Sequence, residues 1–182
     1  MMKLQLSAKK FTAIAVGIAS LAAFAMTAIY NQPSQAQSTN FFCQKSQGVP
    51  ATYARTQSGN IAIIRWISGE FPPPWTPMQR CIEVSRRFQK NYDNGTLKIL
   101  KLGSFNQQTV LCAATSINDS CTDNTLLFTF KPGSKPKQTL ERLLDKRGLA
   151  AGKILTESKD DSSLYIDVNL YLNYATVDTN PL

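Results

Sequence analysis

Residues 61–89, with the sequence IAIIRWISGEFPPPWTPMQRCIEVSRRFQ, place a strand, a proline-rich loop and a helix one after another. The β-branched run at residues 61–67 is typical of a largely buried strand. Thr76 then supplies an N-cap and Pro77 the first residue of a helix, which we expect to end near residue 93. A strand and a helix in this order, with further β-prone runs on either side, predict an α+β fold.

The predicted helix has two different faces. The side chains that recur at three- and four-residue intervals are expected to face the core, and they are Met78, Cys81, Ile82, Ser85 and Phe88. The basic side chains on the opposite side are Arg80, Arg86, Arg87 and Lys90. Glu83 lies among them and can pair with Arg87 one turn later. This basic face is the candidate site for contact with an anionic surface, and the alternative is an ordinary solvated helix face.

The loop before the helix is rich in aromatic residues. Trp66, Phe71 and Trp75 surround three consecutive prolines at residues 72–74. Such a run favours the polyproline conformation. The aromatic residues either form a contact surface for a partner protein or strap the loop across the core by their own burial.

Short β-prone runs, each bounded by turn residues, occupy most of the remaining chain. They cover residues 49–55, 97–102, 109–114 and 126–130. Gly59-Asn60 predicts the turn of a first hairpin with residues 61–67, and the turn of a second hairpin is expected at residues 103–106.

The C-terminal part shows first a helical and then an alternating pattern. Residues 136–147 have their leucines on one face, and Gly148 is expected to stop this helix. Apolar and polar side chains alternate from Leu164 to Leu172, which predicts a strand with one buried face. The tail after Tyr174 is polar and is expected to be loose. Residues 37–182 are therefore predicted to be a single domain with a largely antiparallel sheet of about six or seven strands, two helices and two disulfides.

Four cysteines and the absence of histidine limit the chemistry of the chain. Three disulfide pairings are open, and we favour Cys112 with Cys121, which flank a short polar loop, and hence Cys43 with Cys81. The chain contains no CxxC pair, so neither a metal site nor another cofactor is expected.

The first 36 residues resemble an export signal. Lysines at the start precede an uncharged, mainly apolar run from Phe11 to Tyr30, and Ser34 and Ala36 occupy the small-residue positions that precede cleavage. The run is 20 residues long, which is also enough to span a bilayer, so an uncleaved anchor is the alternative. Either way the domain is expected outside the cytoplasm, in the periplasm, the thylakoid lumen or the exterior.

The charge balance favours anionic partners. Removal of 36 residues leaves 146, with 17 basic residues against 12 acidic ones and a net charge of +5. This bias favours contact with an anionic membrane or envelope surface, while nucleic acid is not expected because the basic residues form no dense tract.

No catalytic residue is predicted. Without histidine, neither a Ser-His-Asp triad nor a Cys-His dyad can form. Two carboxylates would suffice for a hydrolase of an envelope polymer, but the acidic residues are scattered, and Asp167 alone is expected to be partly buried within a strand. We therefore expect a non-enzymatic protein, with the hydrolase and a protein-interaction module that uses the Trp66–Trp75 loop as alternatives.

Three stretches together resemble a known family. They are FFCQKSQGVPATYAR from Phe41, the segment from Ile63 to Gln89 described above, and VLCAA followed by a second cysteine and LLFTFKPG. The combination is similar to the cyanobacterial circadian-oscillating-protein family, from about Phe41 to Tyr171. The resemblance implies an exported protein at the periphery of a membrane, and it brings no catalytic or binding residue with it.

Overall fold

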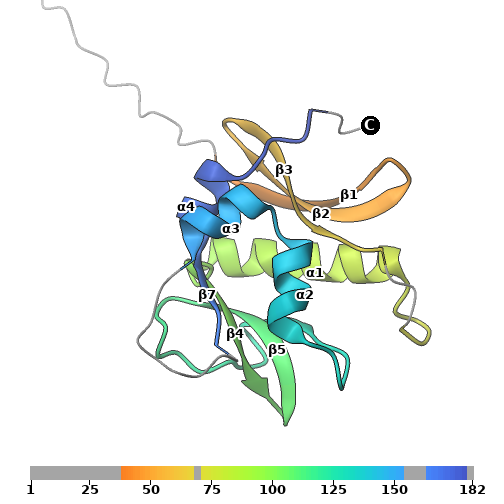
Figure 1. Ribbon diagram of the computed structural model, residues 1–182, viewed down its shortest axis with the longest axis vertical. Coiled ribbons are helices and arrows are strands. Elements are labelled where there is room, and N and C mark those ends of the chain that lie inside the picture. Colours follow the sequence, from red (N-terminus) through yellow and green to blue (C-terminus); the bar gives the residue numbers. More distant parts are fainter. Residues whose placement is uncertain (1–37, 68–70, 154–162, 180–182) are drawn as a thin grey trace, which may run out of the picture. The chain divides into compact units, whose positions relative to one another are not determined.

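Seven strands and four helices follow one another in the residues that the computed structural model describes, which are 38–67, 71–153 and 163–179 (Figure 1). In chain order they are β1 (Asn40–Ser46), β2 (Val49–Thr56), β3 (Gly59–Arg65), α1 (Pro77–Asp93), β4 (Ile99–Phe105), β5 (Gln108–Ala114), β6 (Leu126–Thr129), α2 (Pro136–Leu143), α3 (Lys146–Gly152), β7 (Tyr165–Asp167) and α4 (Val168–Tyr174). The predicted export signal lies outside these residues. None of the helices described has the length and apolar character needed to cross a membrane.

The predicted α+β class and the antiparallel pairing are confirmed, and the strands divide between two sheets. One sheet has the order β1-β2-β3 and the other the order β6-β5-β4-β7. Both predicted hairpins are present, as β2–β3 and β4–β5. β1 was not predicted. It is joined to β2 by a tight turn at Gln47-Gly48, which places Ser46 opposite Val49.

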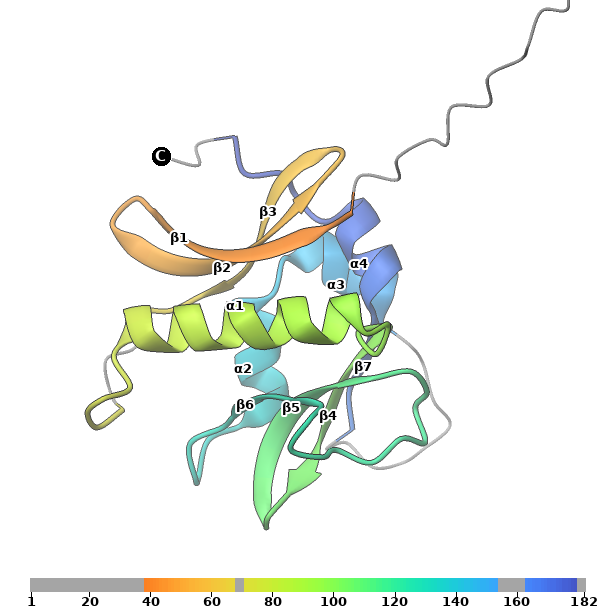
Figure 2. The same cartoon turned by 180° about the vertical axis from the view of Figure 1, so that it is seen from behind.

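Helix α1 lies between the two sheets and closes the core (Figure 2). Phe88 is buried on its inner side and contacts the ring of Phe41 from β1, with 5.4 Å between ring centroids. Leu127 of β6 and Ile64 of β3 belong to the same buried cluster. Burial of one such side chain stabilises the fold by about 1.5–3 kcal/mol, so α1 is the element through which the two sheets stabilise each other.

Both favoured disulfides are present. Cys43 of β1 is bonded to Cys81 of α1, and Cys112 of β5 is bonded to Cys121, with Cα–Cα distances of 5.5 and 5.8 Å. The first bond fixes the outer strand of one sheet to α1. The second holds the 115–121 loop against the hairpin β4–β5, where the sulfur of Cys121 lies over Gly103.

The prediction of one strand from Leu164 to Leu172 is wrong. β7 ends at Asp167, whose carboxylate accepts a hydrogen bond from the Leu170 N–H at 2.8 Å and starts α4. Buried residues in α4 are Val168, Tyr171 and Leu172, which lie three and four positions apart. The alternating pattern was therefore also compatible with one face of a helix, and the N-cap decides between the two.

The predicted second helix is divided in two. α2 ends at Leu143, and Asp145 begins α3 by accepting hydrogen bonds from the N–H groups of Arg147 and Gly148. Gly148 thus lies inside α3 and does not stop a helix. A β-carbon at Gly148 would lie 2.8 Å from the ring and the carbonyl oxygen of Tyr171, so glycine is needed there for α3 to contact α4.

The tail after Tyr174 is not loose over its described part, residues 175–179. The Asp178 N–H donates to the carbonyl oxygen of Asn60 at 2.8 Å. Its carboxylate accepts hydrogen bonds from the Tyr53 hydroxyl at 2.6 Å and from Arg65 at 3.1 Å. Val177 packs against the core next to Gly59. The tail therefore fastens α4 to the sheet β1-β2-β3.

Candidate functional site

The start of α1 is formed as the sequence predicts. One residue of the predicted inner face, Ile82, does not face the core. The hydroxyl oxygen of Thr76 accepts a hydrogen bond from the Gln79 N–H at 3.2 Å. Cys81, Ser85 and Phe88 are buried. Ile82, however, is 52% exposed, because it lies about 100° round the helix from Cys81 and faces solvent.

Arg80 is half-buried, as Arg87 is, and does not share the exposed surface of Arg86 and Lys90. Its guanidinium carbon lies 4.6 Å from the ring centroid of Trp66 and 3.8 Å from that of Phe71. Burial between these rings lowers the pKa of the Arg80 guanidinium from its ordinary value. Two cation–π contacts of this kind contribute about 1–2 kcal/mol each where the charge is partly desolvated.

The aromatic residues around the loop differ in burial. Trp66 is 2% exposed, and its indole N–H donates to the Thr52 hydroxyl at 3.1 Å, so it belongs to the core. Phe71 covers Arg80 and straps the loop to α1. Trp75 is 44% exposed, so its ring is accessible to a partner.

Glu83 joins two of the predicted basic residues. Its carboxylate accepts hydrogen bonds from Arg86 at 2.8 and 3.1 Å and from Arg87 at 2.8 Å. The two hydrogen bonds from Arg86 lower the pKa of Glu83 most, the single hydrogen bond from Arg87 adds to the effect, and the pKa falls to about 2. The predicted pair between Glu83 and Arg87 is thus confirmed. Arg87 also donates to the carbonyl oxygen of Leu127 at 3.2 Å and so connects α1 to β6.

A row of side chains along α1 faces outward. Ile82, Arg86 and Lys90 are exposed and lie four residues apart, which places them on one face of the helix. Trp75 lies at the start of this row, since it shares a shallow hollow with Ile82. We call these four residues the outer row. It combines two cations with two large apolar side chains.

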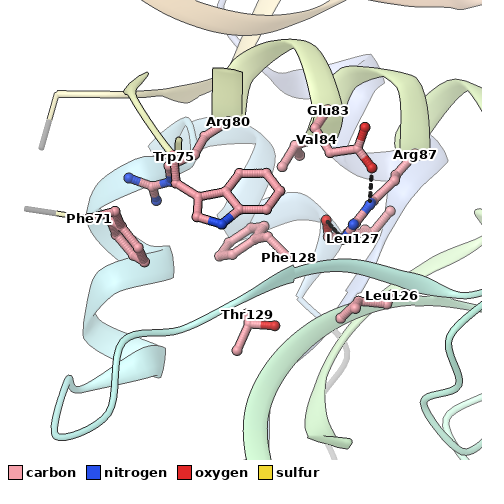
Figure 3. A pocket seen from close by; sticks show the side chains of 10 residues that line it. All are labelled: Phe71, Trp75, Arg80, Glu83, Val84, Arg87, Leu126, Leu127, Phe128 and Thr129. Carbon is pink, nitrogen blue, oxygen red and sulfur yellow. Dashed lines mark hydrogen bonds and ion pairs between the residues drawn. The ribbon is translucent and has the colours of Figure 1, made fainter. Parts of the chain in front are cut away.

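A groove runs along the inner side of Arg80. It consists of two hollows of about 250 and 510 Å³ that share the side chains of Phe71, Arg80, Phe128 and Thr129. The first hollow lies between α1 and β6 (Figure 3). The second extends to the end of β3 and to α2. We call the two together the Arg80 groove.

The Arg80 groove is both basic and apolar. Among the described residues that line it, the basic ones are Arg65, Arg80, Arg87, Lys131 and Arg142. Glu83 is the acidic residue among those lining side chains, and its charge is already shared by two arginines. Arg65 is paired with Asp178. The rest of the lining is mainly aromatic and aliphatic. The sequence did not reveal this groove, because Arg80 and Arg142 belong to separate helices and line the same hollow only in the folded chain.

Several of the described carboxylates have structural roles. Asp119 accepts hydrogen bonds from Thr115 and from the Ser116 N–H within its own turn. Asp145 and the half-buried Asp167 begin helices, as described above. Within residues 38–67, 71–153 and 163–179, no three His, Cys, Asp or Glu side chains are grouped as a metal site would require. These local roles give no support to a carboxylate-dependent hydrolase.

Comparison with known proteins adds one positive finding. A family model described as circadian oscillating protein COP23 matches residues 40–173. This range includes both sheets, the outer row and the Arg80 groove. No curated protein and no solved structure matches the chain.

Proposed function

This chain belongs to the circadian oscillating protein family, and we propose that its folded unit is a non-enzymatic binding protein outside the cytoplasm. It attaches peripherally to an anionic surface of a membrane or of another envelope component. The contact is made by α1, and its charge comes from Arg86 and Lys90 with support from Arg80 and Arg87.

The composition of the outer row carries this proposal. α1 has four basic and two acidic side chains, so the helix is positively charged overall. Trp75 and Ile82 are large apolar side chains that remain exposed beside Arg86 and Lys90. Tryptophan with neighbouring cations is typical of surfaces that lie at a membrane–water interface. The two apolar residues distinguish the outer row from a surface that carries charges alone.

The disulfides support a place outside the cytoplasm. All four described cysteines are paired, and such pairs persist mainly in oxidising compartments. The signal-like residues 1–36 point the same way. The periplasm, the thylakoid lumen and the exterior all satisfy this chemistry.

Salt extraction of the full chain from isolated membranes tests the proposal. We expect release as the ionic strength rises from about 0.1 to 0.5 M, because exposed charges are screened over a few ångströms at the higher value. The double variant Arg86→Gln with Lys90→Gln should be released at lower salt. The matched control is Lys146→Gln with Arg147→Gln, which removes the same charge from α3 and should behave as the wild type.

A variant of opposite sign sharpens this test. Glu83→Gln removes the carboxylate that holds Arg86 and Arg87, so it should raise the salt concentration needed for release. Retention in high salt with release only by detergent would contradict peripheral attachment and would indicate the uncleaved anchor instead. The intact mass of the exported protein shows directly whether residues 1–36 are retained.

A further inference from the structure

We propose that the Arg80 groove is a second binding site, and that it takes an extended acidic peptide segment of a partner protein. One apolar side chain of the peptide contacts the aromatic part of the groove, and its carboxylates contact the basic part. This site shares Trp75 with the outer row but neither of its cations, Arg86 and Lys90, and the inference does not depend on attachment to a membrane.

Charge is the first argument for an acidic ligand. Five basic side chains line the groove against one lining carboxylate, Glu83, among the described residues. Arg87 pairs with Glu83 and Arg65 pairs with Asp178, and an excess of positive charge remains after both ion pairs are counted. Arg142 and Lys131 are exposed and line the second hollow together with Arg80. An acidic ligand in this hollow can therefore meet more than one cation, and a basic ligand would be repelled.

Arg80 is held in place before any ligand binds. The rings of Trp66 and Phe71 cover its guanidinium, and Trp66 is itself fixed by Thr52. A guanidinium that is already ordered loses little side-chain freedom when it meets a carboxylate. This arrangement is more than α1 needs for stability, since an aliphatic side chain would fill the same space without a charge.

The apolar lining provides an anchor point. Phe71, Val84 and Phe128 line the hollow between α1 and β6, and the partly exposed Trp75 stands at its rim (Figure 3). Ile67, which is 77% exposed, lines the second hollow. A peptide side chain such as phenylalanine or leucine would cover part of this apolar surface, as anchor residues do in interfaces.

The shape of the groove favours a chain over a compact small molecule. Sites for small molecules bury about 70–90% of their ligand. Here Trp75, Ile67, Lys131 and Arg142 are all exposed at the walls, so a ligand would keep one side in water, as a peptide in a groove does. The groove also continues from β6 to the end of β3, which suits an extended segment.

Strand β6 offers a backbone contact. It lies at the edge of its sheet, and the Phe130 N–H donates inward to the carbonyl oxygen of Thr109. Because backbone groups alternate along a strand, the N–H and the carbonyl of Thr129 point away from β5. Thr129 lines both hollows, so an extended peptide there can pair with the edge of β6.

Peptide binding to the full chain with its disulfides intact tests the inference. The probes are blocked eight-residue peptides that contain four glutamates around a central phenylalanine, and the same peptides with glutamine in place of glutamate. Binding is followed by calorimetry and by tryptophan fluorescence, and Trp75→Phe shows whether the optical signal comes from the rim of the groove. We expect the glutamate peptides to bind at least about tenfold more tightly than the glutamine peptides at low salt.

Two variants locate the site. Arg142→Gln changes an exposed residue and should weaken binding about threefold to tenfold without loss of folding, while Arg80→Gln should weaken it further. Lys146→Gln with Arg147→Gln is the matched control and should leave binding unchanged. Arg86→Gln with Lys90→Gln tests independence from the outer row and should leave most of the peptide affinity in place.

Other outcomes overturn the inference. Equal binding of glutamate and glutamine peptides, or binding that Arg142→Gln and Arg80→Gln leave unchanged, would show that the groove is not the site. If no peptide binds, and vesicles of anionic phospholipid alter Trp75 fluorescence in a way that depends on Arg142, the groove belongs to a membrane contact instead.

Discussion

Glu83 links two of the four basic residues of α1. It shares one carboxylate between Arg86 and Arg87, and Arg87 in turn reaches β6. The sequence allowed the pairing with Arg87 to be predicted from its spacing of four. The additional bond from Arg86 and the covering of Arg80 by two rings depend on side-chain packing, which spacing alone does not determine.

The ion pairs of Glu83 give a defined acid dependence of stability. Its pKa in the folded protein is about 2, well below the ordinary 4.5. A lowered carboxyl pKa contributes stability that is fully present above the unfolded value and is lost as the pH falls towards the folded value. At pH 7 the free energy of unfolding of the wild type should therefore exceed that of Glu83→Gln by about 1 kcal/mol, since the cluster is half-exposed. Urea denaturation measures this difference. The difference should shrink between about pH 5 and pH 2, and a constant difference across this range would contradict the assignment.

Gly148 allows α3 and α4 to touch. A β-carbon there would meet the ring and carbonyl oxygen of Tyr171 at 2.8 Å, and the Tyr171 hydroxyl accepts a hydrogen bond from the Asp145 N–H. Gly148→Ala should therefore lower the free energy of unfolding by about 1–3 kcal/mol, despite the better helix propensity of alanine. Urea denaturation measures this loss. Gln138→Ala, an exposed change in α2, is the control, and a stability gain at position 148 would show that the two helices can separate without cost.

At the scale of elements, the sequence correctly predicted the helices and strands whose residue pattern is compatible with only one kind of secondary structure. α1 has a cap, a first-turn proline and a helical period, and its predicted start is correct. The segment 164–172 suits both a strand and a helix, because Ile166 and Val168 are two apart while Val168, Tyr171 and Leu172 are three and four apart. The Asp167 cap, whose effect depends on the packing of α4 against α3, determines the outcome. The Arg80 groove could not be predicted, since its walls come from α1, β3, β6 and α2.

The two disulfides should differ in their effect on stability. Cys43 and Cys81 are 38 residues apart and join β1 to α1, while Cys112 and Cys121 are 9 apart. Loop-closure entropy predicts that the free energy of unfolding falls by about 4 kcal/mol in Cys43→Ser with Cys81→Ser. The expected fall is about 2.5 kcal/mol in Cys112→Ser with Cys121→Ser. Thermal and urea unfolding of the two double variants measures both values. A larger loss from the shorter loop would mean that packing of Cys121 over Gly103 outweighs chain entropy.

At the scale of the whole described unit, the two sheets are joined in three ways. α1 lies between them, the Cys43–Cys81 bond fixes α1 to β1, and the tail returns from α4 to β2 and β3. The outer row and the Arg80 groove both depend on this arrangement, because α1 carries the first and forms one wall of the second. Of these three connections, the sequence did not indicate the one made by the tail, since Asp178 is remote in sequence from Tyr53 and Arg65.

Removal of the Asp178 carboxylate should loosen the sheet β1-β2-β3 from the rest of the unit. Asp178 accepts hydrogen bonds from Tyr53, Ser46 and Arg65. Tyr53 is fully buried. Asp178→Ala leaves the Tyr53 hydroxyl without its 2.6 Å partner, so the free energy of unfolding should fall by about 1–3 kcal/mol. Thr179→Ala, an exposed change next to it, should have little effect. Hydrogen exchange locates the change: amides of β2 and β3 should exchange faster in Asp178→Ala, while those of β4 and β5 keep their protection. Equal acceleration in both sheets would show that the tail stabilises the whole unit uniformly and does not act as a local fastening.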